Sequence, residues 1–159
     1  MTTDPHYARE QLAELAKSLE SRRTGRRWGA KAATRLEVEL VQGMYLIGKL
    51  QAANELSETA ANHRYEINMF PKRVRQDDGV AGAEMMHDLY QMNHANTEHL
   101  TSLQISTHVV HNALFELCLT PGRMLTGVFL SSVDTRDEKL LLIGIDQIIQ
   151  IFRQASQKA

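Results

Sequence analysis

Apolar side chains recur at helical spacing along most of this chain, and the longest continuous pattern lies in residues 80–119. Its members share one face of a helix, whose period is about 3.6 residues. They are Met85, Leu89, Met92, Leu100, Leu103, Val110, Leu114 and Leu117. Thr120-Pro121-Gly122 ends the pattern, because proline and glycine interrupt helices. The sequence therefore predicts one long helix over residues 80–119, against which the other elements pack.

Two helices are predicted before the long one. The first begins at Asp4-Pro5, because an aspartate side chain accepts hydrogen bonds from the first-turn amides and proline suits the first helical position. The second extends from about Trp28 to Leu56 and contains Gly43 and Gly48. Glycine in a helix interior costs about 1 kcal/mol relative to alanine, so we expect a neighbouring helix to approach closely at both positions.

The remaining segments are also predicted to be helical. Residues 57–70 either continue the second helix or form a separate one, and their weak pattern leaves both readings open. A short helix is expected over residues 121–132, and Asp134 is expected to cap the last helix. The stretch Leu140–Phe152 is rich in β-branched residues, as strands are, but its length and its cap favour a helix.

The length and composition are those of one globular domain, with 159 residues of which 43% are hydrophobic and 23% charged. No segment with the alternating period of a strand stands out. We therefore expect an all-α fold, a single-domain bundle of about four to six helices over residues 1–159 with the long helix at its centre. Wide apolar stripes and only nine aromatic residues leave apolar surface to cover, which favours a homodimer.

The expected location is the cytoplasm, with no membrane contact. The N-terminus lacks the apolar segment of a signal peptide, and no apolar run approaches the ~20 residues that cross a bilayer. The single cysteine, Cys118, can form no internal disulfide, which fits a reducing compartment. It lies between two leucines, so we expect a small buried side chain.

Basic residues concentrate near the N-terminus. Residues 17–35 hold seven basic residues and one acidic residue, a net charge of +6, while the rest of the chain holds 11 basic and 18 acidic residues. Guanidinium groups grip phosphate or carboxylate oxygens with paired hydrogen bonds, and a tryptophan can stack on a base. The candidate binding residues are Arg22, Arg23, Arg26, Arg27, Trp28, Lys31 and Arg35, with a second basic group at Lys72, Arg73 and Arg75.

Three functions are compatible with this distribution of charge. The first is a non-catalytic, nucleic-acid-associated subunit that contacts the phosphate backbone of DNA or RNA through residues 22–35. The second is a protein-interaction module or adaptor that binds an acidic partner or a second copy of itself, although the arginines could also pair with the chain's own Glu37 and Glu39. The third is a metal-independent nuclease with His108 and His111 as acid and base, two residues whose ordinary role would be packing at a helix interface.

Patterns for metal binding and catalysis are incomplete. Glu84-x-x-His87 has the spacing of half a di-iron site, but the chain has no second motif of this kind. His94-x-x-x-Glu98 also lacks further ligands, and all four side chains lie opposite the apolar stripe of the predicted helix. We therefore expect no metal, no cofactor and no enzymatic activity.

Overall fold

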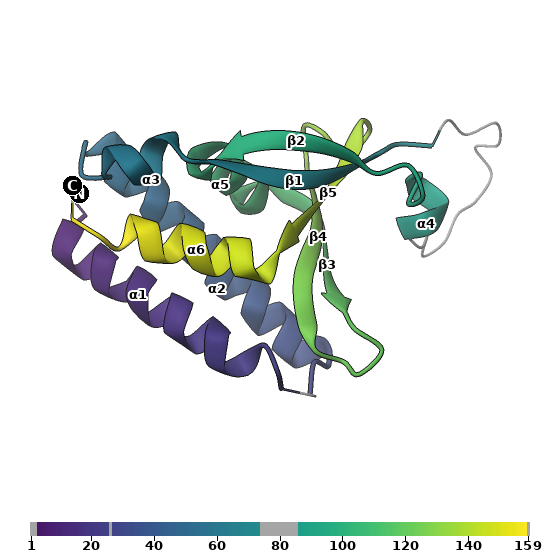
Figure 1. Ribbon diagram of the computed structural model, residues 1–159, viewed down its shortest axis with the longest axis horizontal. Helices are drawn as coiled ribbons and strands as arrows, with labels where there is room; N and C mark the ends of the chain where they lie inside the picture. The colour runs from purple at the N-terminus through teal and green to yellow at the C-terminus, as the bar shows by residue number, and fades with distance from the viewer. Residues whose placement is uncertain (1–2, 26, 74–85, 159) are drawn as a thin grey trace.

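The computed structural model describes residues 3–25, 27–73 and 86–158, and they form a mixed α/β fold (Figure 1). The expected all-α bundle is therefore wrong. In chain order the described elements are α1 (Pro5–Arg22), α2 (Ala30–Ala52), α3 (Glu58–Asn62), β1 (Arg64–Pro71), α4 (Met86–Leu89), β2 (Asn96–Thr101), α5 (Ser102–Val110), β3 (Asn112–Leu119), β4 (Leu125–Ser132), β5 (Lys139–Gly144) and α6 (Ile145–Ala155).

The first two helices follow the sequence prediction. Asp4 caps α1, where its Oδ1 accepts a hydrogen bond from the backbone N–H of His6 at 2.9 Å, and Pro5 occupies the first helical position. α2 lies within the expected 28–56 segment. Residues 57–70, which the sequence left open, form a separate short helix, α3, and most of strand β1. None of the helices in the described ranges is long and apolar enough to cross a bilayer.

The five strands form one antiparallel sheet in the order β2-β1-β5-β4-β3. Met69 of β1 lies opposite Leu141 of β5, and Leu141 also lies opposite Leu130 of β4. This order places β1 and β5, which are far apart in sequence, side by side within the sheet. It leaves β2 and β3 as the two edge strands.

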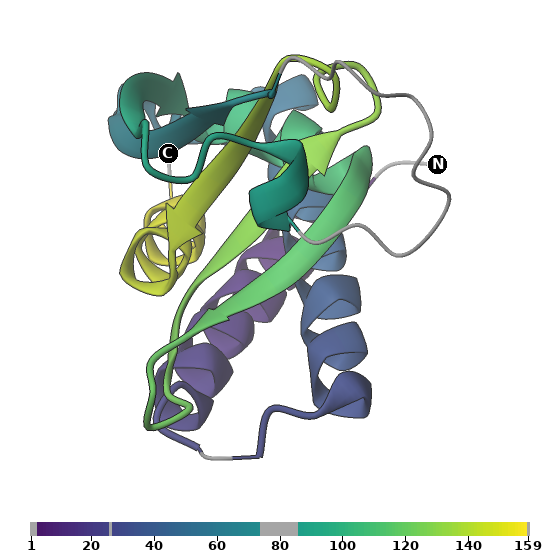
Figure 2. The same ribbon diagram turned by 90° about the vertical axis from the view of Figure 1, so that its right-hand side faces the viewer.

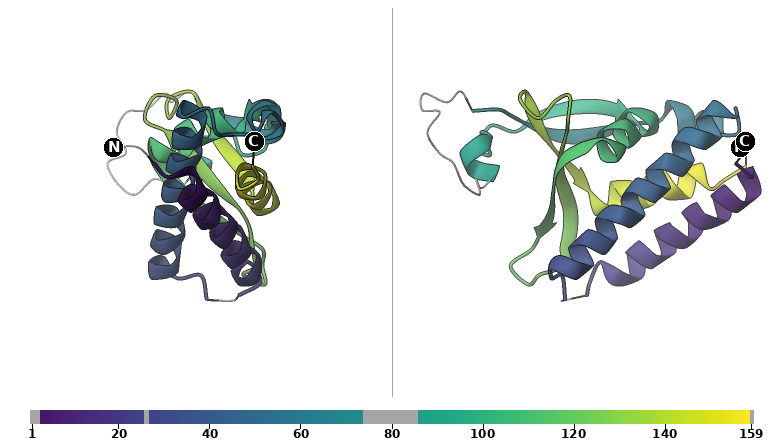
Figure 3. Two further views of the ribbon diagram at one scale, coloured as in Figure 1. Left: turned by 90° about the vertical axis from the view of Figure 1, so that its left-hand side faces the viewer. Right: turned by 180° about the vertical axis from the view of Figure 1, so that it is seen from behind.

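Helices α2, α5 and α6 lie on one face of the sheet, and α1 packs outside them against α6 and α2 (Figures 1 and 3). α1 packs mainly against α6, and α2 mainly against α5. The strand side chains buried beneath them include Tyr65, Ile67, Val128, Leu130, Leu141 and Ile143. On the other face a smaller cluster forms, in which Leu89 of α4 and Tyr90 pack with Phe70 and Leu140. The central strands are therefore covered by apolar groups on both faces.

The long helix expected over residues 80–119 does not form. Residues 86–119 contain α4, β2, α5 and β3 instead, and residues 74–85 lie outside the described part of the chain. A capping box starts α5: the Thr101 hydroxyl accepts from the Gln104 amide, and the Gln104 side chain accepts from the Thr101 amide. This reciprocal pair fixes a helix start in the middle of the stretch that the apolar spacing assigns to one continuous helix.

The two expected C-terminal helices are also corrected. Residues 121–132 form β4 and the turn before it, rather than a short helix. Asp134 lies in a turn that leads into β5, and the helix α6 starts only after Gly144, whose amide donates to the Gln147 side chain at 2.9 Å. The stretch Leu140–Phe152 is thus partly strand and partly helix.

Cys118 lies on the edge strand β3 and is partly exposed, where the sequence predicts a buried side chain. An edge strand has a neighbour on one side only, so its side chains are less covered than those of a central strand. Cys118 is the only cysteine of the chain, and it therefore offers a single chemical handle on this edge.

Candidate anion-binding pocket

The connection between α1 and α2 is anchored to the hairpin of β3 and β4 (Figure 2). The Leu125 amide donates to the Arg23 carbonyl at 2.9 Å, and the Arg123 guanidinium donates to the Trp28 carbonyl at 2.9 Å. These two bonds hold the basic segment of the sequence against the body of the protein. The hairpin therefore lies beside the C-terminal end of α1, the N-terminal end of α2 and the connection between them.

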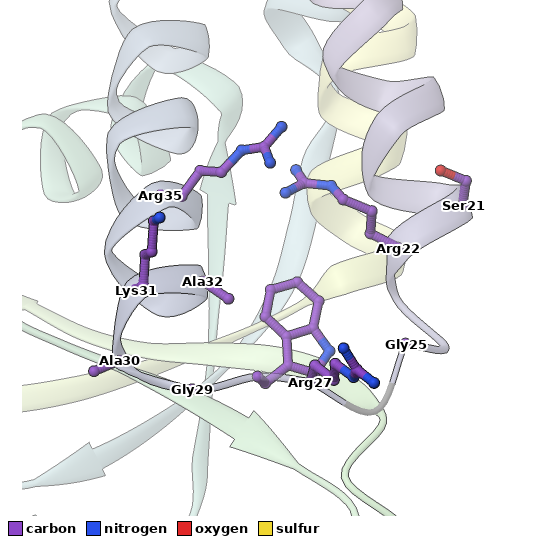
Figure 4. A pocket seen from close by; sticks show the side chains of 10 residues that line it. Ser21, Arg22, Gly25, Arg27, Gly29, Ala30, Lys31, Ala32 and Arg35 are labelled. Carbon is purple, nitrogen blue, oxygen red and sulfur yellow. The ribbon is translucent and has the colours of Figure 1, made fainter.

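An open pocket of about 890 Å³ lies at this connection (Figure 4). It is called the basic pocket here, and its lining residues are Ser21, Arg22, Gly25, Arg27, Trp28, Gly29, Ala30, Lys31, Ala32 and Arg35. Five of them are sequence-predicted site residues. Alanine, glycine and tryptophan form much of the remaining wall, so cationic groups stand beside apolar surface. Such a lining suits a ligand that is both anionic and partly apolar.

The N-terminus of the 23-residue helix α2 opens into the basic pocket. Its N-cap residue is Gly29, which offers no side chain to the free amides, and its first turn contains no acidic residue. The first amides of a helix have no partner within the helix, and they carry a positive partial charge. In contrast, Asp4 caps α1 and Thr101 caps α5 with their side chains. The positive end of α2 is thus uncompensated beside a row of cationic side chains.

Two of the predicted arginines share the carboxylate of Glu39. Its carboxylate accepts from Arg22 of α1 at 2.6 Å and from Arg35 of α2 at 2.9 Å. Figure 4 shows the two guanidinium groups pointing toward each other across the pocket. The Glu39 side chain is 16% exposed, so this ion pair lies close to the protein body. The three groups together carry a single positive charge.

Arg23 is paired as well, but outside the pocket lining. Its guanidinium donates to the Asp146 carboxylate at the start of α6. This hydrogen bond raises the pKa of Arg23 and lowers the pKa of Asp146. The pair joins the end of α1 to α6 and therefore has a structural role.

Arg27 and Lys31 are the cations left for a ligand. Both are exposed, and neither has an ion-pair partner within the described ranges. Trp28, 7% exposed, lies between them in sequence, and its indole N–H is buried without a hydrogen-bond partner among the described residues. The Nε–H of Arg22 is also buried without a hydrogen-bond partner among the described residues. Buried donors are normally paired, so two unpaired donors from residues of one pocket lining are unusual.

The second basic group does not join the first. Lys72 and Arg73 follow β1, at a different end of the molecule from the α1–α2 connection (Figures 1 and 2). The Lys72 ammonium lies 5.2 Å from the centre of the Tyr90 ring, and the Arg73 Nε donates to the Tyr90 carbonyl at 3.1 Å. The two groups therefore form no continuous basic track. The other two predicted residues, Arg26 and Arg75, lie outside the described part of the chain.

The histidines considered as acid and base are not brought together with the basic pocket. His108 lies half-buried on α5, and burial is the main cause that lowers its pKa, followed by the charge of Lys139. His111 is exposed at the end of α5. Glu98, expected opposite the apolar stripe of the predicted long helix, is half-buried and pairs with Lys139 at 2.7 Å. No group of three or more potential metal ligands occurs in residues 3–25, 27–73 and 86–158.

Sequence reasoning missed the uncapped start of α2. It named Glu39 as a possible partner of the arginines, but not that Arg22 and Arg35 share this one carboxylate. One signal for Glu39 was present, because Arg35 precedes it by four residues on a helix, a spacing that favours ion pairs. A signal for the start of α2 was present as well, since Gly29 precedes the helical pattern without a capping serine, threonine or aspartate. Comparison of the chain with models of protein families, with curated proteins and with solved structures gives no match.

Proposed function

We propose that this protein is a non-catalytic binding protein whose basic pocket holds an acidic segment of a partner protein. The observation that carries the proposal is the uncapped N-terminus of α2, which opens into a concave pocket beside Arg27 and Lys31, two cations with no ion-pair partner among the described residues. Helix amides and cationic side chains that converge on one site bind carboxylates well. The apolar wall at Trp28 favours a segment that also carries an apolar side chain.

The distribution of charge favours a short acidic determinant over a nucleic acid. Nucleic-acid binding gains from neutralising many phosphates along an extended path. Here Arg22, Arg23 and Arg35 are occupied by the chain's own carboxylates, and the second basic group lies elsewhere. Beyond residues 17–35 the chain carries more acidic than basic residues, so a long polyanion would meet repulsion outside the pocket.

The buried state of Trp28 points the same way. A base that stacks on an aromatic side chain needs an accessible ring face. Trp28 is only 7% exposed, so it contributes wall area rather than a stacking platform. A peptide side chain can pack against the small lining residues Gly25, Gly29, Ala30 and Ala32 while flanking carboxylates reach the cations.

The test uses Trp28 as the reporter, since it is the only tryptophan in the chain. Its fluorescence is followed while the protein of residues 1–159 is titrated with acetyl-Glu-Glu-Phe-Glu-Glu-amide, here called the pocket peptide. The neutral analogue acetyl-Gln-Gln-Phe-Gln-Gln-amide and a single-stranded DNA oligonucleotide are titrated in parallel. We expect a saturable change with the pocket peptide and at least about tenfold weaker binding of the neutral analogue, a difference of about 1.4 kcal/mol.

Charge reversal locates the binding. Arg27→Glu combined with Lys31→Glu should weaken binding of the pocket peptide by at least about tenfold, since two cations are replaced by anions. The matched control is Lys17→Glu, an exposed residue of α1 that does not line the pocket, and its effect should stay within about twofold. Equal binding of the charged and neutral peptides would overturn the proposal. The proposal would also be overturned if the oligonucleotide bound more tightly than the pocket peptide and the double variant abolished that binding. This result would assign the pocket to nucleic acid.

A further inference from the structure

The edge strand β3 is open to a further strand. β3 pairs with β4 on one side, and no strand of the described residues pairs with its other side. The outward amides and carbonyls of an edge strand are a template for an extended peptide, which adds as a new strand. The opposite edge, β2, is less suited, because its exposed residues Asn96, Thr97 and His99 are polar.

A groove of about 400 Å³ runs between β3 and the first half of α2, and it is called the edge groove here. Its lining residues are Trp28, Gly29, Ala30, Ala33, Thr34, Glu37, Phe115, Glu116, Leu117 and Leu119. Phe115 and Leu117 alternate along β3, and Leu119 follows a register shift after Cys118. All three pack at the margin of the main core and stay partly exposed. A strand laid beside β3 would place its own alternate side chains into the same groove.

The edge groove and the basic pocket flank the start of α2 and meet there. They share Trp28, Gly29 and Ala30, the residues that lead into α2. The Leu119 end of β3 leads into the turn that is bonded to the Trp28 carbonyl through Arg123. A single extended segment can therefore follow β3 and end at the uncapped start of α2.

The charges of the two sites specify complementary charges on this segment. The edge groove contains Glu37 and Glu116, and neither has an ion-pair partner within the described ranges. The basic pocket contains Arg27 and Lys31. A uniformly acidic segment would be repelled from the groove, whereas one with a basic residue at one end and acidic residues at the other matches both sites.

The geometry points to strand addition as the binding mode: an extended partner segment pairs with β3, places alternating apolar side chains in the edge groove, and ends with acidic residues in the basic pocket. This inference rests on the proposed function for its acidic end. The bonds to β3 are made by the backbone, so they supply affinity, and the charges at the two ends supply the register.

The test extends the pocket peptide in both chain directions, because the open edge accepts either a parallel or an antiparallel strand. One probe carries Thr-Val-Thr-Val-Lys after the pocket sequence, and the other carries Lys-Val-Thr-Val-Thr before it. Their matched controls replace the central threonine of each extension with proline, which removes an amide donor and disfavours a regular strand. Binding is measured by Trp28 fluorescence, and protection of residues 112–119 is measured by amide hydrogen exchange.

We expect one of the two extended peptides to bind at least about tenfold more tightly than the pocket peptide and to slow exchange in β3, with both effects lost in its proline control. On the protein side, Ala33→Gln should fill the edge groove and remove the gain, while Val38→Gln, on an exposed position of α2 outside the groove, should not.

Binding of the pocket peptide without any gain from either extension would overturn strand addition and leave the proposed function standing. Protection of β3 by an extended peptide, with no binding of the pocket peptide, would support strand addition and overturn the proposed function. Exchange in β3 that slows with protein concentration alone would assign the edge to a second copy of the chain and overturn the inference.

Discussion

Arg22 on α1 and Glu39 on α2 form an ion pair of 2.6 Å that closes one side of the basic pocket. The same carboxylate also binds Arg35 at 2.9 Å. The Arg22 side chain is 25% exposed and that of Glu39 16%, so the pair is largely shielded from water. Glu39 therefore joins the two long helices and at the same time lowers the positive charge available to a ligand.

Glu39→Gln should separate these two roles of the carboxylate. Loss of the anion leaves Arg22 without its charged partner in a poorly solvated place, which should lower the free energy of unfolding by about 1–3 kcal/mol. The pocket gains one positive charge, so the pocket peptide should bind severalfold more tightly. Urea unfolding measures the first effect, and Trp28 fluorescence measures the second.

The control for this substitution is Glu14→Gln, which removes the same charge from an exposed position of α1. It should change stability by no more than about 0.5 kcal/mol and leave peptide affinity unchanged. An unchanged affinity in Glu39→Gln itself would contradict the view that Glu39 competes with the ligand for Arg22 and Arg35.

Gly43 and Gly48 of α2 should respond in opposite directions to alanine. A β carbon at position 43 would lie 2.6 Å from Cζ of the buried Phe152 and 3.0 Å from Leu15, so α1 and α6 approach α2 closely there. At position 48 no atom lies within 4 Å. Gly43→Ala should lower stability by about 1–3 kcal/mol through overpacking, and Gly48→Ala should raise it by up to about 1 kcal/mol through helix propensity.

Thermal or urea unfolding of the two glycine variants gives the comparison, and each serves as the control of the other. The sequence predicts close helix contacts at both positions, but the structure has such a contact only at Gly43. A stabilised Gly43→Ala variant would mean that Phe152 can move aside at little cost.

The sequence predicts the helices before residue 58 correctly because their apolar residues lie on one face only. In the sheet, β5 buries Leu141 and Ile143 toward the helices and Leu140 on the opposite face, so the strand reads as a continuous apolar run. A strand covered on both faces loses the alternation that identifies it. The edge strands β2 and β3 fail for another reason, because their apolar residues and those of α5 fall three or four apart and the sequence assigns them to one helix. β1 does alternate, with Tyr65 and Ile67 buried between exposed neighbours.

The location of the candidate site was accessible from the sequence, since clustered arginines and a single tryptophan stand out by composition. The number of positive charges that are free to bind a ligand was not accessible from the sequence. It depends on contacts between distant residues, such as Arg22 with Glu39 and Arg23 with Asp146, which no local pattern specifies. The separation of Lys72 from the first basic group depends on the sheet order in the same way.

Tyr65 should resist ionisation in alkali. Burial raises its pKa to about 12, and its hydroxyl donates to the Gln154 side chain at 2.7 Å. The unfolded chain ionises this phenol near its ordinary pKa of about 10, so the folded state loses stability as the pH rises above that value. Unfolding measured at increasing pH should show this loss, and Tyr65→Phe should reduce it. Ultraviolet titration of the wild type should show a phenol that ionises only near the pH of unfolding.

His108 should make the fold sensitive to mild acid. Burial lowers its pKa first, Lys139 lowers it further, and Glu98 opposes both. Above the unfolded pKa of about 6.5 the imidazole is neutral in both states and contributes nothing to the pH dependence. Below it the unfolded chain takes up a proton that the folded chain does not yet accept, so stability falls as the pH is lowered through this range.

The measurement is urea unfolding between neutral pH and mild acid for the wild type, His108→Gln and His94→Gln. His108→Gln should make the acid slope shallower, and His94→Gln, at an exposed position, controls for the substitution itself. Because Lys139 and Glu98 form a 2.7 Å ion pair beside this imidazole, Glu98→Gln should remove the opposing charge and lower the pKa of His108 further. An imidazole of His108 that titrates by NMR above its ordinary value would contradict this account, since burial and Lys139 would then not control its charge.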